Sequence, residues 1–225
     1  MNAKTLASSA ALLLLGLMSG TASAGFIEWT DWTSSPTSTT VLGKIGSIDV
    51  TYTGNFSFVQ TGPECTNYWT EPNASSLPYT GNPVIDNAPT ACEMVALNIA
   101  DSHTISFSEE ILNPVMAIVS LGRNSERWRV TYDFDTAFTI LSNGQGYWGA
   151  GTAVTGEVHT LTGYEFHGAI QFDGAVSSLS WTSLQSENWH GFTFGRATSV
   201  PEPGTLALLG LGLAGMGLAT RRKKV

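Results

Sequence analysis

The chain has 225 residues, with 18 acidic and 10 basic side chains and a formal net charge of −8 at pH 7. Half of the basic residues lie near the two ends, so residues 25–199 hold seventeen acidic and five basic side chains, a formal charge of −12. Proteins bind nucleic acid largely by neutralising phosphates with Lys and Arg, so this balance argues against a nucleic-acid partner. The roughly 175 residues between the ends suffice for one domain with a hydrophobic core.

The first 24 residues have the pattern of a secretory signal peptide. Lys4 supplies a positive charge, and an apolar run from Ala10 to Met18 follows it. Ala22 and Ala24 place small residues where a signal peptidase reads them, so we expect that enzyme to cleave after Ala24. The alternative is a retained N-terminal anchor, for which the apolar run is short. Cleavage would leave an exported chain.

The exported part shows the period-two alternation of β-strands and no sustained helical period. Apolar and polar residues alternate from Ile48 to Tyr52 and from Ile105 to Phe107. The mostly apolar run from Val115 to Leu121 predicts a strand that is covered on both faces. The clearest alternation, from Arg127 to Phe134, predicts a strand with Trp128 on its apolar side.

Turn residues divide the rest of this part into short strands. Asn143-Gly144 predicts a hairpin turn that leads to Tyr147 and Trp148. Tyr164 to Phe172 is expected to form one strand with a bulge near Gly168. Roughly ten to twelve short strands, separated by Gly, Asn and Pro, are typical of an all-β fold of the antiparallel β-sandwich type, and a jelly roll suits that number.

Cys65 and Cys92 are the two cysteines, and both lie in the exported part. A lone pair in an oxidising compartment predicts one disulfide. It would close an irregular segment rich in Pro, Asn, Ser and Thr, and the chain-entropy model gives about 3–4 kcal/mol of stabilisation for a loop of this length. A redox or metal pair is the alternative, but Cys-x-x-Cys spacing and a nearby histidine are missing.

Candidate catalytic groups are few. Asp133 and Asp135 share the polar side of one predicted strand, where an acid–base pair for glycan cleavage would need carboxylates that face each other. Arg127 and Arg129 lie on the same side and are the expected ion-pair partners. The four histidines follow no zinc-binding spacing, and the sequence has no Gly-x-Ser-x-Gly elbow. These aspartates are therefore interpreted as a solvated, paired surface.

No cofactor or metal is expected, with one alternative left open. Asp101 and Glu109-Glu110 could supply oxygens to a structural Ca²⁺, although no EF-hand loop is present.

Seven tryptophans are many for a domain of this size. Five of them lie near predicted strand ends or loops: Trp29, Trp32, Trp69, Trp148 and Trp189. Of these, Trp69, Trp148 and Trp189 are the candidates for stacking on sugar rings. Asn67, Tyr68 and Asn188 are neighbours that could orient a sugar. For each tryptophan the alternative is a place in the core, because aromatic side chains dominate core burial.

The last 26 residues contain three parts in order. An extended spacer comes first because proline disfavours helix, and it consists of Val200, Pro201, Glu202, Pro203 and Gly204. An uncharged run then continues to Thr220 and would span about 25 Å as a transmembrane helix. Four basic residues end the chain and should stay on the cytoplasmic side of the membrane: Arg221, Arg222, Lys223 and Lys224.

This tail closely resembles the PEP-CTERM sorting signal of proteins exported by Gram-negative bacteria that make exopolysaccharide. The resemblance covers about an eighth of the chain. It implies that an exosortase, a membrane-embedded transpeptidase-like enzyme, recognises an inner-membrane intermediate and cuts it near Pro201-Glu202-Pro203. The alternative is a plain single-pass anchor with a proline-rich stalk.

The expected organisation is therefore a signal peptide (1–24), a β-sandwich ectodomain (25–199) and a sorting signal (200–225). The favoured function is non-enzymatic: a protein of the outer envelope, cell surface or extracellular matrix that works alongside exopolysaccharide in a biofilm. A carbohydrate-binding module with exposed tryptophans is the first alternative. A glycan-active hydrolase or lyase is less favoured, because no opposed carboxylate pair is evident.

Overall fold

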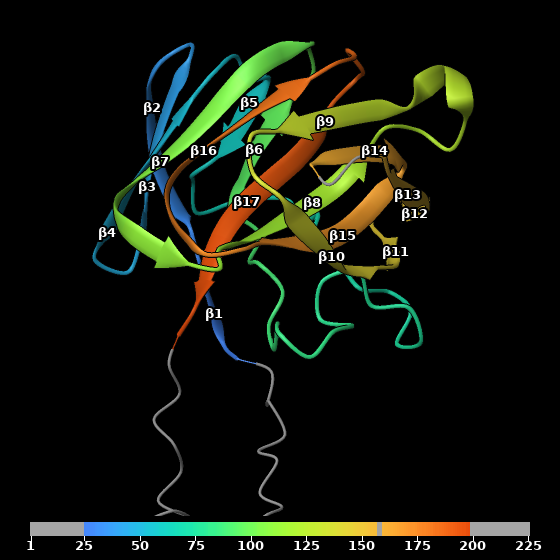
Figure 1. Ribbon diagram of the computed structural model, residues 1–225, viewed down its shortest axis with the longest axis horizontal. Coiled ribbons are helices and arrows are strands. Elements are labelled where there is room, and N and C mark those ends of the chain that lie inside the picture. The colour runs from blue at the N-terminus through green and yellow to red at the C-terminus, as the bar shows by residue number, and fades with distance from the viewer. Residues whose placement is uncertain (1–24, 157–158, 199–225) are drawn as a thin grey trace, which may run out of the picture.

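The computed structural model describes residues 25–156 and 159–198 of the chain. These residues form two antiparallel sheets that pack face to face, which confirms the all-β expectation (Figure 1). The predicted signal peptide, with Ala22 and Ala24, and the predicted tail from Val200 to Val225 lie outside the described residues. Among the residues described, no helix is long and apolar enough to cross a membrane.

The first sheet, called sheet I, has seven strands. Its order is β10 (Phe138–Asn143), β15 (Phe166–Phe172), β8 (Val115–Leu121), β17 (His190–Ala197), β6 (Met94–Leu97) and β5 (Phe58–Gln60), with β1 (Ile27–Trp29) paired to the end of β17.

The second sheet, called sheet II, has eight strands. Its order is β13 (Thr152–Thr155), β14 (Thr160–Tyr164), β9 (Val130–Phe134), β16 (Ala175–Ser183), β7 (Asp101–Leu112), β4 (Ile48–Thr53), β3 (Thr40–Ile45) and β2 (Asp31–Thr37). A small separate hairpin joins β11 (Gln145–Gly146) to β12 (Gly149–Ala150).

The connections interleave the two sheets. Strands β6, β8, β15 and β17 are neighbours in sheet I in the order β6-β17-β8-β15, while β7, β9, β14 and β16 are neighbours in sheet II in the order β7-β16-β9-β14. This is the interleaved strand order of a jelly roll, whose two sheets enclose a single core. Strands β10 and β13 extend the two sheets at one side, and β2–β4 extend sheet II at the other.

The core between the sheets is mainly aromatic. Trp181 of sheet II packs edge-on against Phe192 of sheet I with ring centroids 5.2 Å apart, and Phe134 packs against Phe172 at 5.1 Å. Edge-to-face contacts at this distance stabilise a core beyond the area that the rings bury. The alternating strands expected around Ile48–Tyr52 and Ile105–Phe107 are β4 and β7, and their apolar residues face this core.

The outer face of sheet I is covered by the irregular segment 61–93. β8 is buried at all seven positions, as its apolar sequence predicted. Trp69, Tyr79 and Ile85 of the segment form a second hydrophobic cluster with small residues of sheet I, among them Ala117 and Ala169. The predicted disulfide Cys65–Cys92 closes the segment.

The Glu71 side chain stabilises the same segment by hydrogen bonds to its backbone. Its carboxylate accepts hydrogen bonds from the backbone N–H groups of Tyr79 and Thr80, both at 2.8 Å, and from the Thr80 hydroxyl at 2.7 Å. One acidic side chain therefore replaces the backbone pairing that a regular strand would provide.

The two ends of the described chain lie side by side, as Figure 1 shows. Ile27 to Trp29 pair with Gly195 to Ala197, and the backbone N–H and the hydroxyl of Thr198 both donate to the carbonyl of Phe26 at 2.9 Å. The Gly25 N–H donates to Val84 O at 3.0 Å.

The strand expected from Arg127 to Phe134 starts later, at Val130. Glu126–Trp128 is a short 3₁₀ helix, and the Trp128 side chain is 45% exposed, so its expected place on the apolar side was wrong. The guanidinium groups of Arg123 and Arg127 lie 5.8 and 4.9 Å from the Trp128 ring. These cation–π contacts hold the indole at the surface.

Two further turns differ from the sequence prediction. The hairpin turn falls at Tyr147–Trp148, not at Asn143-Gly144, because β10 stays paired with β15 as far as Asn143. The expected single strand from Tyr164 to Phe172 is two strands, since the chain crosses from sheet II to sheet I at Glu165, whose φ is +62°.

Candidate functional site

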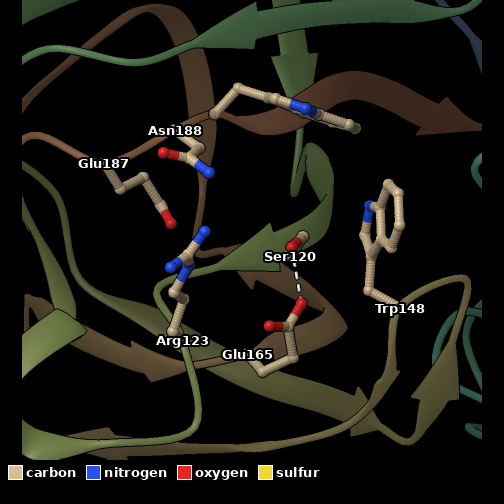
Figure 2. Close-up of a pocket in the computed structure, with 7 residues that line it drawn as sticks. Ser120, Arg123, Trp148, Glu165, Glu187 and Asn188 are labelled. Atoms are coloured by element: carbon tan, nitrogen blue, oxygen red, sulfur yellow. Dashed lines mark hydrogen bonds between the residues drawn. The ribbon is translucent and has the colours of Figure 1, made fainter.

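A cavity of about 290 Å³ opens at one end of sheet I. β8 runs antiparallel to both β15 and β17, so its last residues lie beside the first residues of those two strands. The side chains that line the cavity come from these strand ends, the adjoining loops and the β11–β12 turn: Ser120, Arg123, Trp148, Glu165, Glu187, Asn188 and Trp189 (Figure 2).

A β-bulge turns Ser120 toward the cavity. Leu121 pairs with Phe166 and Ile118 with Gly168, so β8 contains one more residue than β15 over this stretch. Ser120 has a φ of +60°, and its hydroxyl donates to Glu165 Oε1 at 2.5 Å. Bulges of this kind re-aim a side chain and occur often beside functional sites.

Glu165 is held in an equally uncommon conformation. It occupies the crossing between the sheets at a φ of +62°, and its side chain is 17% exposed. His167 Nε2 approaches the same Oε1 atom at 3.5 Å, from a ring that is completely buried. Left-handed backbone at a residue other than glycine costs about 1–3 kcal/mol and clusters at ligand sites. Here two such residues are joined by one hydrogen bond.

The other described residue with this backbone has a structural explanation. Asn113 has a φ of +48°, and its Oδ1 accepts from the Gly174 N–H at 2.7 Å in the turn before β16. Asparagine tolerates this region through such local hydrogen bonds. Ser120 lies in a β-bulge and Glu165 at the crossing between the sheets, and both residues line the cavity.

Glu187 enters the cavity from the loop between β16 and β17. Its side chain is 4% exposed, and Oε1 accepts from the Gly122 N–H at 2.9 Å and lies 2.5 Å from His190 Nδ1. These bonds tie the β16–β17 loop to the end of β8. The hydrogen bonds of Glu165 and Glu187 all converge on Oε1, and Oε2 of each accepts none from the residues that the structure describes.

Arg123 brings the positive charge of the cavity. Its side chain is exposed, lies over Trp128 and forms no salt bridge with a described residue. In the close-up, Arg123, Ser120 and Glu165 lie between Trp148 on one side and Glu187 with Asn188 on the other (Figure 2).

Aromatic rings form one wall. Trp148 is 54% exposed at the β11–β12 turn, and its ring centroid lies 6.3 Å from that of Trp189. Tyr68 contacts Trp189 at 4.9 Å and Tyr147 at 5.0 Å, and Tyr147 contacts Trp148 at 4.8 Å. All four contacts are edge-on. Each ring therefore supports the next by its edge, which holds the cluster rigid beside the cavity.

The structure brings two of the three predicted stacking residues together. Trp148 and Trp189 line the same cavity, and the predicted neighbour Asn188 lines it with them. Trp69 was wrongly placed in this group, because it is only 2% exposed. Its ring packs edge-on against Tyr79, 5.3 Å away, between segment 61–93 and the outer face of sheet I. Its neighbour Tyr68 joins the exposed cluster instead.

The charged residues of the cavity were missed from the sequence. Arg123, Glu165 and Glu187 come from three separate connections, and no short motif relates them. No signal in the sequence marks Glu165, because it stands at an alternate position of the predicted strand from Tyr164 to Phe172, where a polar residue is expected.

The aspartates considered as an acid–base pair have structural roles. Asp133 Oδ1 lies 2.9 Å from His159 Nδ1, and Asp135 accepts from the Ser180 N–H at 3.0 Å. The expected ion pairs with Arg127 and Arg129 were wrong: Arg129 pairs with Glu126 at 3.2 Å, because the 3₁₀ turn separates these arginines from the strand.

The residues that the structure describes contain no group of three or more His, Cys, Asp or Glu side chains able to hold a metal. Of the residues considered for Ca²⁺, Asp101 accepts from the Asn55 side chain at 2.7 Å, and Glu109 and Glu110 are exposed on β7.

A buried polar layer lies behind Glu187, between the sheets. The His190 ring contacts the Tyr132 ring at 5.3 Å, and the Tyr52 hydroxyl lies 2.7 Å from His103 Nδ1. Burial lowers the pKa of His103 to about 4, with His190 adding to the effect and Asp101 opposing it. Burial, and then the charge of Glu187, raises the pKa of Tyr132. Both side chains are therefore neutral near pH 7.

Fold and cavity define an all-β, jelly-roll ectodomain with an aromatic-walled cavity at one end of the sandwich. The chain continues from this domain into a PEP-CTERM protein-sorting motif, which matches residues 199–223 and confirms the predicted resemblance. The motif implies export through the envelope of a Gram-negative bacterium and processing by an exosortase. No curated protein and no solved structure matches the chain.

Proposed function

We propose that the chain is a non-enzymatic protein of the cell surface or extracellular matrix, and that its jelly-roll domain holds exopolysaccharide. The observation that carries this proposal is the rigid cluster of Tyr68, Tyr147, Trp148 and Trp189 beside a polar cavity. Aromatic faces provide apolar contact for a sugar ring, while a few fixed polar groups bind its hydroxyls and set its orientation.

The two ends of the chain support the location. Signal peptidase acting after Ala24 would release the N-terminus outside the cytoplasm, and the uncharged run to Thr220 would hold an inner-membrane intermediate, with Arg221 to Lys224 on the cytoplasmic side. Exosortase cutting near Pro201-Glu202-Pro203 would then free the domain for the outer envelope or the matrix. There it would meet the polysaccharide that such bacteria secrete.

Mutation of the aromatic wall tests the binding function. The mature protein, recovered from its host, is titrated with the host's exopolysaccharide by isothermal calorimetry. We expect Trp148→Ala to weaken binding about tenfold or more, since buried tryptophan contacts dominate interface affinities. Phe26→Ala is the control, because Phe26 is also an exposed aromatic residue and does not line the cavity. Equal effects of the two variants would refute the proposal.

Glycan cleavage is a second candidate, favoured by one observation. Two glutamates from different connections, Glu165 and Glu187, enter the same cavity, and hydrolases of glycans use two carboxylates that flank the scissile bond. A hydrolase would release reducing ends from the polysaccharide, and a lyase would release unsaturated ends. For a binding protein we expect neither product, and product formation that is lost in Glu165→Gln would establish the enzyme instead.

Processing is tested separately from binding. Intact mass and C-terminal peptide mapping of the protein from the host's envelope and medium should show a form that begins at Gly25 and ends between Val200 and Pro203. Replacing Pro201-Glu202-Pro203 with alanine should leave membrane insertion intact and block this cut. Replacing Arg221 to Lys224 with neutral residues should reduce retention at the membrane. A mature form that still ends at Val225 would make the tail an ordinary anchor.

A further inference from the structure

The inner part of the cavity offers hydrogen-bond acceptors. The Ser120 hydroxyl directs its hydrogen to Glu165 Oε1, so its oxygen can only accept a further bond. Glu165 and Glu187 are both largely buried, and the Oε2 atom of each carries no hydrogen bond from the described residues. A ligand group that reaches this part must therefore donate hydrogen bonds.

The charge of the cavity also favours a ligand group that donates hydrogen bonds and is positively charged. Two carboxylates line it against one guanidinium, and the surrounding residues 25–199 carry a formal charge of −12. Buried carboxylates lose hydration, and an opposite charge close to them recovers part of that loss. The nearest basic groups are histidines: His190 beside Glu187, and His167, whose two ring nitrogens are buried and lack hydrogen-bond partners. A cationic ligand would supply the missing charge.

We propose that the cavity binds the protonated amine of a hexosamine unit, with Glu165 and Glu187 as its acceptors and an adjoining sugar face on Trp148. The ligand class is a polysaccharide of amino sugars with free amino groups. This inference rests on the proposed glycan-binding function and names its substrate class. Hydrogen bonds from an ammonium group to carboxylates are roughly twice as strong as neutral ones.

The same chemistry disfavours two other classes of sugar. N-acetylation removes the charge and replaces an ammonium donor with an amide that carries a carbonyl acceptor, which the inner oxygens cannot bind. A uronic acid would bring a third carboxylate toward Glu165 and Glu187, with Arg123 as the one arginine or lysine that lines the cavity. The order of affinity is therefore amino sugar first, N-acetylated sugar second and uronate last.

The test uses three defined probes with the mature protein: the hexamers of glucosamine, N-acetylglucosamine and galacturonic acid. We expect the glucosamine hexamer to bind about tenfold more tightly than its N-acetylated form. The double variant Glu165→Gln with Glu187→Gln should erase this preference by weakening the binding of the glucosamine hexamer. Glu165→Gln alone should reduce the preference in part, which keeps the test valid if the double variant does not fold.

A matched control separates the cavity from general attraction between an acidic protein and a cationic sugar. Glu109→Gln with Glu110→Gln removes the same charge from exposed positions on β7, near the start of β8 and so at the opposite end of that strand from the cavity. We expect this variant to keep the preference for glucosamine. An equal loss in both double variants would overturn the inference.

The outcomes also separate the inference from the function on which it rests. If all neutral and amino hexamers bind equally and Trp148→Ala abolishes binding, the amine site is wrong and glycan binding stands. If no hexamer binds at millimolar concentration and Trp148→Ala has no effect on binding of the host polysaccharide, both proposals fail.

Discussion

The two outer faces of the sandwich differ in their side chains and in what covers them. The outer face of sheet II carries a ladder of hydroxyl pairs open to solvent, in which Thr104 lies 3.1 Å from Ser180 and Ser106 lies 3.5 Å from Ser178. The outer face of sheet I carries Ala117, Val119 and Ala169 beneath segment 61–93. In sheet II, β4 and β7 alternate between buried and exposed positions, whereas β6 and β8 of sheet I are buried at every position.

The difference shows where a jelly roll can place a site. A hydroxyl ladder satisfies its own hydrogen bonds. The covered face needs an irregular segment, and the rim of that segment brings Tyr68 beside the β11–β12 turn and the β16–β17 loop. The cavity lies beside this edge of segment 61–93, at the end of sheet I. Four predictions test the contrast.

Truncating Trp69, the buried tryptophan of segment 61–93, should have the largest effect on stability. Trp69→Ala removes an indole from the cluster between this segment and sheet I and should lower the free energy of unfolding by about 3–5 kcal/mol. Trp128→Ala, at an exposed ring, should change it by about 0.5 kcal/mol or less. Urea denaturation followed by circular dichroism measures both. Similar losses would mean that the segment is not an integral part of the core.

Removing the disulfide should destabilise segment 61–93 locally and leave the local stability of sheet II unchanged. Replacing Cys65 and Cys92 with serine should cost about 3 kcal/mol, since the bond closes a sequence separation of 27 residues. Amide exchange should increase in segment 61–93 and stay unchanged in β7 and β16. Because Tyr68 lies inside the loop, glycan binding should weaken as well. Uniform exchange over both sheets would contradict this prediction.

Lowering the pH should destabilise the protein through His103, in the buried polar layer between the two sheets. The folded pKa of His103, about 4, lies below the value near 6.5 of the unfolded chain, so the unfolded state binds the extra proton between these values. Stability is therefore complete above pH 6.5 and should fall by up to about 3 kcal/mol as the pH drops to 4.

The variant His103→Gln isolates this contribution. It should flatten the pH dependence between 6.5 and 4, measured as the urea midpoint at each pH. The Asn55 hydrogen bond lowers the pKa of Asp101, so the contribution of that carboxylate is lost only below its ordinary pKa of 3.8, outside the window. An unchanged slope in His103→Gln would assign the acid sensitivity to other groups.

The smallest effect is expected on the open face. Ser106→Ala removes one exposed hydroxyl from the ladder and should shift stability by about 0.5 kcal/mol or less. The reverse change on the covered face, Ala117→Ser, buries a hydroxyl with no partner and should cost about 1–3 kcal/mol. Thermal unfolding of the two variants side by side measures the contrast, and equal shifts would remove it.

The sequence predicted much of the regular structure, because the alternation in β4 and β7 and the continuous apolar run of β8 directly reflect how many faces each strand buries. It could not show the crossing at Glu165, since the period-two pattern continues on both sides of that residue. It also could not choose between Tyr68 and Trp69: in an irregular segment no period states which of two neighbours faces the core.

The cavity was predictable in part. Its two tryptophans stood out by residue type and by their places in loops. Its glutamates and arginine did not, because acidic residues are common in this chain and the relevant ones are separated by 22 residues or more of sequence. Only the jelly-roll connections bring the end of β8 and the starts of β15 and β17 together.

The pairing of the chain ends has a consequence for maturation. β17 lies in the middle of sheet I and closes on β1, so the jelly roll cannot assemble until its final strand has left the export channel. Among the described residues, Gly25 and Thr198 form the backbone hydrogen bonds nearest the two ends of the domain. Signal peptidase acting after Ala24 and exosortase acting beyond Val200 would each cut just outside those bonds. Both scissions would therefore trim the chain to the edge of its folded unit and leave every strand contact in place.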